Sequence, residues 1–262
     1  MKPAPFEYVR PTSLAEAGAL LTPGARLIAG GQSLGPLLNL RLARVQRLVA
    51  IGGLAELGQV QETRETLILG AGLTHAAIAD GRTPDLGERW LARIADRIAY
   101  RAVRNRGTIG GSLAHADPSA DWLATLTALG GSVLTWRARG PGRAIPLEAF
   151  VSGPLANILE PGEIVQAVRL PRPGRGARWG YFKACRKPGE LAYAMAAFLD
   201  DPERGVRRAA IGAINGPPVV LIGGQARPEA VEEALAARGL DAIGRRMQAV
   251  ALDRAIAEAR GL

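Results

Sequence analysis

The stretch RNRGTIGGSLAHADPSAD, residues 104–121, places two adjacent glycines and an Asp-Pro step just ahead of an apolar segment. Adjacent glycines allow successive backbone N–H groups to converge without a Cβ in the way, and such a group of amides binds phosphate oxygens. The simpler interpretation is a tight corner between a strand and a helix. This stretch alone leaves both interpretations open.

A second glycine pair occurs in a similar context, in Gly30-Gly31-Gln32-Ser33. Each pair follows a short apolar segment that is predicted to be a strand, Leu27-Ile28-Ala29 or Thr108-Ile109. Two amide pockets of this kind match the two phosphates of a pyrophosphate, and Ser33, Thr108 and Ser112 add hydroxyl donors. Neither loop fits GxGxxG or GxxxxGK(S/T), so the two standard nucleotide-binding folds are not indicated.

The composition is that of a globular protein with 262 residues, of which 48% are hydrophobic. This is enough for a sizeable core in roughly two or three subdomains. No run of about 18 uninterrupted apolar residues is present, so we expect no membrane span. The first residues, MKPAPFEYVRPTS, lack the apolar region of a secretory signal peptide. We therefore expect a cytoplasmic protein.

Residue counts narrow the possible chemistry. The single cysteine, Cys185, and the two histidines, His75 and His115, indicate neither a disulfide framework nor a metal site. The net charge of +9 comes from arginines scattered along the chain, and only 5% of the residues are aromatic, so we expect no nucleic-acid interface. The sequence shows no obvious acid–base pair or activated nucleophile, and we assign no catalytic residue.

Strands and helices alternate over about residues 1–55, which predicts a small α/β unit, and the chain as a whole is predicted to be α+β. A helix begins near Thr74, after an apolar strand and a glycine turn. Residues 87–107 have the apolar spacing of an amphipathic helix. A further helix is predicted from Pro118 to Leu129, with Asp117 as its N-cap.

The clearest linker is the proline- and glycine-rich segment at residues 171–176. After it, three segments predict a three-stranded antiparallel sheet, and two helices follow. We expect three parts: an N-terminal α/β unit at residues 1–55, a second unit at 56–172 and a C-terminal domain at 177–262.

Several segments together resemble the FAD-binding medium subunit of the molybdenum hydroxylases, the family of carbon monoxide dehydrogenase medium subunits and xanthine dehydrogenase FAD domains. They are AGGQSLGPLLNLR (29–41), GAGLTH (70–75), VRNRGTIGGSLAHADPSAD (103–121), GEIVQAVRLP (162–171) and, more loosely, FKACRKPGELAYA (182–194). The resemblance spans nearly the whole chain in order. It implies a two-subdomain, PCMH-type (vanillyl-alcohol-oxidase-like) FAD-binding fold, followed by the C-terminal domain.

By this resemblance, an extended FAD lies in the N-terminal region with its pyrophosphate against the two glycine loops. Asp121 matches a carboxylate that hydrogen-bonds the cofactor, Ile98 lies near it, and Val165 and Lys183 flank it. The residues implied to bind FAD are Leu27, Ile28, Ala29, Gly30, Gly31, Gln32, Ser33, Leu34, Thr74, Ile98, Thr108, Ile109, Gly110, Gly111, Ser112, Asp117, Asp121, Val165 and Lys183.

Structural alternatives exist for three of these residues. Asp117 is explained equally well as a helix cap, Asp121 as a complement to a helix dipole, and Lys183 as a solvated residue on a strand edge. The chain also departs from the family at Leu191, where relatives often have an aromatic residue that covers one face of the isoalloxazine.

The resemblance implies a flavoprotein subunit of a molybdenum hydroxylase. A large molybdopterin subunit would oxidise the substrate, and a small subunit with 2Fe-2S clusters would relay electrons to the FAD of this chain. The FAD would pass them to an external acceptor such as NAD, a quinone or oxygen, in a dimer of heterotrimers. A self-contained flavin oxidoreductase of the same fold and a basic binding module without redox function are the alternatives.

Overall fold

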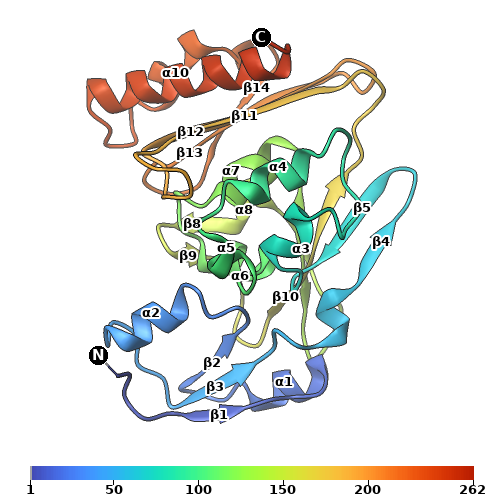
Figure 1. Ribbon diagram of the computed structural model, residues 1–262, viewed down its shortest axis with the longest axis vertical. Coiled ribbons are helices and arrows are strands. Elements are labelled where there is room, and N and C mark those ends of the chain that lie inside the picture. Colours follow the sequence, from blue (N-terminus) through green and yellow to red (C-terminus); the bar gives the residue numbers. More distant parts are fainter. Residues whose placement is uncertain (1) are drawn as a thin grey trace.

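Three β-sheets follow one another along the chain, and a layer of short helices lies between the second and the third (Figure 1). The computed structural model describes residues 2–262. The sheets have three, five and four strands, and a two-stranded ribbon accompanies the second. The α+β class is therefore confirmed. Each main sheet falls within one of the ranges 1–55, 56–172 and 177–262, which we retain as proposed domain boundaries.

The N-terminal sheet is parallel, with the strand order β1-β3-β2. Because β2 is parallel to its neighbour, its carboxyl end leads at the edge of the sheet into the Gly30-Gly31 loop. Loops at the carboxyl ends of parallel strands are the usual ligand-binding edge of such sheets. The elements of this unit are β1 (Glu7–Val9), α1 (Leu14–Leu20), β2 (Ala25–Ile28), α2 (Leu34–Asn39), β3 (Arg47–Ala50) and the 3-10 helix η1 (Ala55–Gly58).

The second sheet is antiparallel, with the order β4-β5-β10-β6-β7. Its central strand β10 is largely buried and pairs with β5 and β6, which brings residues 66–70 and 132–136 to either side of it. The strands are β4 (Val60–Glu62), β5 (Thr66–Gly70), β6 (Ser132–Trp136), β7 (Ala144–Pro146) and β10 (Ile164–Pro171), and the ribbon is formed by β8 (Val151–Gly153) and β9 (Ala156–Asn157).

The helical layer differs in detail from the prediction. The helix predicted over residues 87–107 is interrupted at Ala99, whose φ of 43° is not helical. The next long helix begins at Asp121 rather than Pro118, because the Asp117 carboxylate accepts the N–H of Ser119 in a separate turn at 2.9 Å. The helices are α3 (His75–Ala79), α4 (Trp90–Asp96), α5 (Arg101–Arg104), α6 (Ile109–His115), α7 (Asp121–Ala128) and α8 (Leu147–Phe150).

The C-terminal sheet is antiparallel and has the predicted three strands plus a fourth, β14, which was not predicted. Helix α10 covers one face of this sheet and the helical layer covers the other (Figure 1). Side chains along β12 alternate accordingly: Phe198 packs in the cluster with α10, whereas Met195 and Leu199 belong to the central core. The elements are β11 (Arg178–Ala184), β12 (Ala194–Asp201), β13 (Val206–Gly212), β14 (Val219–Ile222), η2 (Gly223–Gln225), η3 (Pro228–Ala230), α9 (Val231–Ala234) and α10 (Ala242–Ala259).

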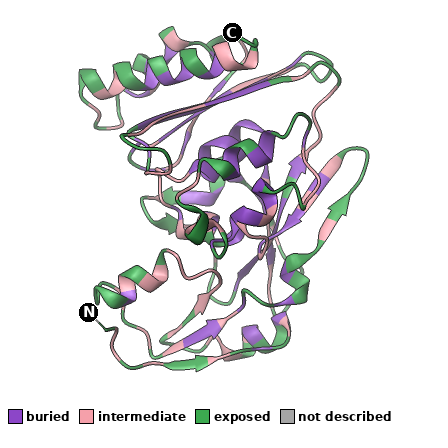
Figure 2. Ribbon diagram, viewed as in Figure 1, coloured by how far each residue is buried: buried purple, intermediate pink, exposed green. Residues whose placement is uncertain are grey.

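Buried residues concentrate in the helical layer and the strands that flank it (Figure 2). Within residues 2–262, no helix combines the length and the apolar character that crossing a membrane requires. The buried layer joins the second unit to the C-terminal sheet in a single hydrophobic cluster. It therefore supports the residues of α6 and α7 that face the N-terminal unit.

Candidate functional site

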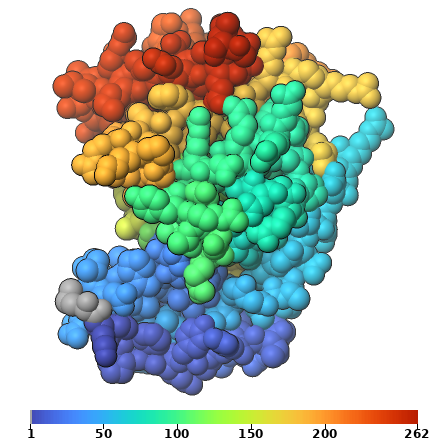
Figure 3. Space-filling view, viewed as in Figure 1, coloured from blue at the N-terminus to red at the C-terminus, as the bar shows by residue number. Residues whose placement is uncertain are grey.

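A cleft of about 630 Å³ lies where the N-terminal unit faces the second unit. Figure 3 shows the blue N-terminal part beneath the green helical layer, with an indentation between them at the left edge. The volume falls within the range of about 300–1,000 Å³ that is typical of ligand and cofactor sites. The Gly30-Gly31 loop, helix α6, the start of α7 and the start of β10 all contribute to its lining.

The first glycine loop presents unused backbone donors to this cleft. Within the described range 2–262, the N–H groups of Gly30, Gly31, Gln32, Ser33 and Leu34 donate to no protein acceptor. Gly31 has a φ of 71°, in the left-handed region that favours glycine. The loop is braced by the Gln32 side-chain amide, which donates to the Gly30 carbonyl at 2.9 Å. Five consecutive amides are thus available at this loop, as the predicted amide pocket requires.

The second glycine pair has a different role from the one predicted. Thr108 and Ile109 do not form a strand: Thr108 caps α6, and its hydroxyl accepts the N–H of Gly111 at 3.0 Å. The N–H of Ile109 donates to Leu73, and that of Gly110 to Ala71, each at 3.0 Å. These amides are satisfied within the protein, so the prediction of a second amide pocket is wrong.

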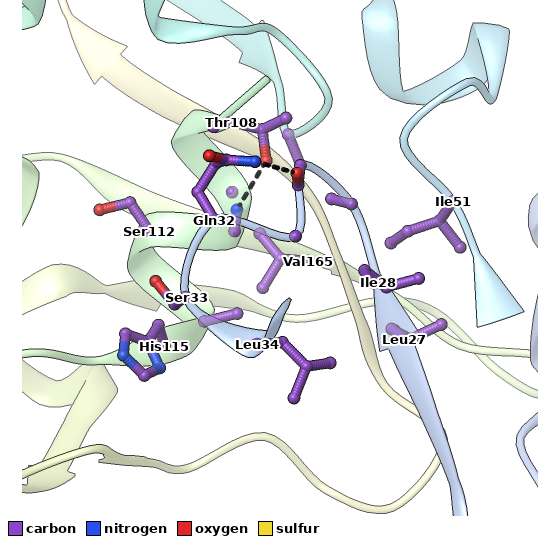
Figure 4. A pocket seen from close by; sticks show the side chains of 18 of the residues that line it. Leu27, Ile28, Gln32, Ser33, Leu34, Ile51, Thr108, Ser112, His115 and Val165 are labelled. Atoms are coloured by element: carbon purple, nitrogen blue, oxygen red, sulfur yellow. Dashed lines mark hydrogen bonds between the residues drawn. The ribbon is translucent and has the colours of Figure 1, made fainter. Parts of the chain in front are cut away.

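The glycines of the second pair instead allow close packing. A Cβ on Gly110 would lie 2.4 Å from the Cβ of Ala71, which is far inside van der Waals contact. The loop after β5 and the first turn of α6 can therefore touch. Helix α6 also contributes the hydroxyl group of Ser112 to the lining of the cleft. In Figure 4, Ser112 lies on the same side of the first loop as Ser33, and Leu27 and Ile51 lie on the other side.

Asp121, the first residue of α7, anchors the inner end of the cleft to the C-terminal sheet. Its carboxylate accepts hydrogen bonds from Tyr181 Oη at 2.6 Å and Lys183 Nζ at 2.8 Å, and the side chain is only 5% exposed. Burial raises the pKa of Asp121 above its usual 3.8, while the charge of Lys183 opposes this. The Lys183 ammonium also donates to the Arg97 carbonyl at 2.9 Å. Lys183 is thus not a solvated residue on a strand edge.

Replacement of Lys183 with methionine should leave the Asp121 carboxylate buried without a counter-charge. We expect the free energy of unfolding to fall by about 1–3 kcal/mol at neutral pH. A carboxyl group whose pKa is raised on folding contributes stability below its unfolded pKa and loses it as pH rises through the folded pKa. Loss of Lys183 raises the pKa of Asp121 further, so the deficit should be larger at pH 7 than at about pH 4. Urea denaturation at both pH values measures it.

The matched control is Asp121→Asn in the Lys183→Met background. It removes the charge that lost its partner, so it should restore most of the stability at neutral pH. A deficit that does not depend on pH, or that the second substitution does not relieve, would contradict this account of the pair.

Glu163 fixes the hairpin at the other rim of the cleft. Its buried carboxylate accepts hydrogen bonds from Arg143 Nε at 2.9 Å, Arg137 Nη2 at 2.6 Å and Thr135 Oγ1 at 3.1 Å. It also accepts the backbone N–H of Glu160 at 2.8 Å, which closes the turn between the two glutamates. The arginines, Arg143 first, hold the pKa of Glu163 far below its usual range. The carboxylate is therefore a structural anion rather than a proton donor.

Most residues that the sequence assigned to the site do line the cleft, and three do not. Thr74 caps α3 by accepting the N–H of Ala77 at 3.1 Å, Ile109 is fully buried in the core, and Lys183 reaches the site only through Asp121. The assigned residues in the lining are Leu27, Ile28, Ala29, Gly30, Gly31, Gln32, Ser33, Leu34, Ile98, Thr108, Gly110, Gly111, Ser112, Asp117, Asp121 and Val165.

The sequence missed other lining residues, among them Ile51, His75 and Glu163. His75 lies in the segment GAGLTH that carries part of the resemblance, where the polar role was assigned to its neighbour Thr74. Glu163 gives no local signal, because its partners Arg137 and Arg143 are distant in the sequence. Leu191, which the resemblance singles out as a departure from the family, also lines the cleft.

The chain matches the family model of the FAD binding domain in molybdopterin dehydrogenase over residues 4–173. The chain is 32% identical over 225 residues to the beta subunit of caffeine dehydrogenase from Pseudomonas sp. (strain CBB1), covering 84% of this chain and 76% of that protein. It is 36% identical over 207 residues to the carbon monoxide dehydrogenase medium chain of Hydrogenophaga pseudoflava, covering 76% and 70%.

Solved structures extend the likeness to the C-terminal sheet. The chain matches a carbon monoxide dehydrogenase structure from Hydrogenophaga pseudoflava, which lacks the Mo-pyranopterin moiety, with a TM-score of 0.87 and 31% identity. It matches quinoline 2-oxidoreductase from Pseudomonas putida 86 with a TM-score of 0.85 and 30% identity. Both matches cover 100% of this chain and 99% of the other. The chain therefore belongs to the family of FAD-binding domains of molybdopterin dehydrogenases, which confirms the family, the enzyme class and the FAD cofactor that the sequence resemblance implied.

Proposed function

We propose that this chain holds FAD in the cleft between its first two units and passes electrons through it. The FAD would receive them from the 2Fe-2S clusters of a small partner subunit and give them to an external acceptor. The observation that carries the proposal is the run of unused amides from Gly30 to Leu34 in a cleft of cofactor size. Converging backbone donors of this kind bind phosphate oxygens.

The residues of the cleft fit an extended dinucleotide. The Gly30–Leu34 amides would bind the pyrophosphate, and the hydroxyls of Ser33 and Ser112 lie on the same side of the loop to add donors (Figure 4). Leu27, Ile28 and Ile51 on the other side form an apolar surface against which a flat ring can pack. The second glycine pair would shape the cleft through close packing rather than bind phosphate.

Bound FAD would supply the redox chemistry, because flavins accept and release electrons. The protein would bind, orient and shield the cofactor. Asp121, held by Lys183 and Tyr181, would offer a fixed acceptor at the inner end of the cleft. Burial and the nearby Asp121 raise the pKa of Tyr181 well above 10, so the phenol remains a donor to Asp121. Asp117, Ile98 and Val165 would complete the contacts as lining residues.

The relatives support the proposed partners. These are medium, alpha, beta or FAD subunits of dehydrogenases and hydroxylases named for caffeine, carbon monoxide, nicotine and other compounds. Because similar chains occur with such different substrates, we place substrate recognition on a large molybdopterin subunit. We propose a dimer of heterotrimers, with the cytoplasm as the location expected from the sequence.

The test is FAD binding by the purified chain, followed by isolation of the complex from its host. We expect the chain to be yellow, or to become so on addition of FAD, and to quench flavin fluorescence at one site per chain. The native complex should contain an iron–sulfur chain and a molybdopterin chain. A colourless chain that takes up no FAD would refute the cofactor role. Full oxidase turnover by the isolated chain would refute the role as an electron-transfer subunit.

A further inference from the structure

His75 is the one histidine in the described chain whose tautomer is fixed by a buried partner. Its Nδ1 lies 3.1 Å from the indole Nε1 of Trp122, and both side chains are buried. An indole N–H can only donate, so Nδ1 must accept and the ring proton of the neutral imidazole must lie on Nε2. Burial, with the charge of Arg104, lowers the pKa of His75 to about 4, in agreement with a neutral ring.

The Nε2–H group has no acceptor within residues 2–262. The Cδ2–Nε2 edge of the ring faces Gly107, because a Cβ on Gly107 would lie 2.9 Å from both atoms. Gly107 and His75 both line the cleft, and a Cβ on Gly30 would lie 2.8 Å from Gly107 Cα. The donor is therefore close to the loop that carries the unused amides.

The nearest charged group does not satisfy this donor. Arg104 is a cation without an acceptor, and its Nη1 donates to the carbonyls of Ile98 and Ala99. Among the described residues, His75 Nε2 is not one of the buried polar atoms that lack a partner, so the atom keeps an accessible side in the cleft that His75 lines. A ligand that brings an acceptor there gains a hydrogen bond to a donor that no protein atom uses.

We propose that His75 is a cofactor-binding residue that donates its Nε2–H to an acceptor atom of bound FAD, with Trp122 as the positioning residue that fixes the tautomer. This inference rests on the proposed FAD site. It assigns to the histidine a hydrogen bond that no protein acceptor makes and that a ligand in the cleft can complete, and it gives Trp122 a role beyond filling the core. It also explains why Gly107 has no side chain, since a methyl group there would meet Nε2.

Two substitutions separate the two edges of the ring. His75→Asn keeps an oxygen near the position of Nδ1, which can accept from Trp122, but has no group at the position of Nε2. His75→Gln places an amide N–H near Nε2, but gives up the acceptor for Trp122. A purely structural role predicts that Gln harms the protein more than Asn. Donation to FAD predicts the opposite order for cofactor affinity.

The experiment is titration of the full-length chain with FAD by flavin fluorescence, with thermal unfolding of each cofactor-free variant as the folding control. We expect His75→Asn to weaken FAD binding by about 5- to 50-fold and His75→Gln by less than about 3-fold. Titration with riboflavin and with ADP then shows which half of FAD accepts the hydrogen bond, because the loss should follow one of them.

Equal affinity for FAD in the wild-type and His75→Asn chains would overturn the assignment while the FAD site itself stands. A larger loss with Gln than with Asn would also overturn it, because the indole contact would then account for the effect. A wild-type chain that binds no FAD would overturn both the proposed function and this inference.

Discussion

Replacement of Glu163 with glutamine should cost about 2–3 kcal/mol of folding free energy, since breaking a buried ion pair typically costs 3–5 kcal/mol and the two arginines here are partly exposed. The side chain of Glu163 is 1% exposed, whereas those of Arg137 and Arg143 are 28% and 32% exposed. Glutamine retains an acceptor for Thr135 but removes the charge that holds both guanidinium groups. Denaturation in urea at neutral pH measures the difference.

The pH dependence of this stability difference tests whether the negative charge of Glu163 causes it. A carboxyl group whose pKa is depressed on folding contributes stability above its unfolded pKa and loses it as pH falls toward the folded pKa. The difference between the wild type and Glu163→Gln should therefore be full at neutral pH and shrink as pH falls below 4.5, the ordinary value for glutamate. A difference that stays constant down to pH 3 would point to packing instead.

Glu160 supplies the matched control, because it contacts the same two arginines from the solvent side. Its distances to Arg137 and Arg143 are 3.3 and 3.6 Å, and its side chain is 57% exposed. Exposed pairs of this kind contribute about 0–1 kcal/mol, so Glu160→Gln should be nearly neutral. Equal losses from the two substitutions would refute the anchoring role of Glu163.

The sequence predicted the parts of the site whose signal is local. Glycine at positions 30 and 31, after a short apolar strand, indicated a backbone pocket, and the structure has unused amides there. The same reasoning failed at Gly110 and Gly111, because the Gly110 amide has its acceptor on the loop after β5, more than thirty residues earlier in the sequence, and the Gly111 amide donates to the hydroxyl of Thr108. A glycine pair indicates that another group approaches the backbone too closely for a Cβ. Only the tertiary structure shows whether that group is a ligand or another part of the protein.

The contacts that the sequence did not predict join residues that are distant in the sequence. The sequence pattern predicts Trp122 to be an apolar residue of a helix. Its hydrogen bond to His75 joins positions that are 47 residues apart. Lys183 has the pattern of an exposed strand residue, but the C-terminal sheet packs on α7 through β12 and β13, and Lys183 on the neighbouring strand β11 then reaches Asp121. The predicted start of α7 was wrong for a related reason. Asp117 has the chemistry of an N-cap, but its carboxylate closes a separate turn before α7 begins.

Substitution of alanine for Gly30 should have the largest effect on the site, with FAD affinity reduced by more than about 100-fold. The added Cβ would lie 2.0 Å from the carbonyl oxygen of Arg106 and 2.8 Å from Gly107 Cα. Both obstacles are backbone atoms, which cannot rotate away as a flexible side chain would. The first loop and the segment before α6 must therefore separate, which displaces the unused amides from the face of α6 that they oppose.

The magnitude follows from the packing. Overpacked positions commonly cost about 1–3 kcal/mol, and a contact with fixed backbone lies at or above the upper end.

Gly35→Ala is the control, because Gly35 is in α2 and no atom lies within 4 Å of its Cβ position. Alanine at position 35 should therefore leave FAD affinity unchanged and raise helix stability slightly. Fluorescence titration with FAD and thermal unfolding of both variants test the pair. Full FAD affinity in Gly30→Ala would mean that the cofactor does not depend on the spacing of these two segments. In that case the Gly30–Leu34 amides could not be the phosphate site, because displacing them would have had no consequence for binding.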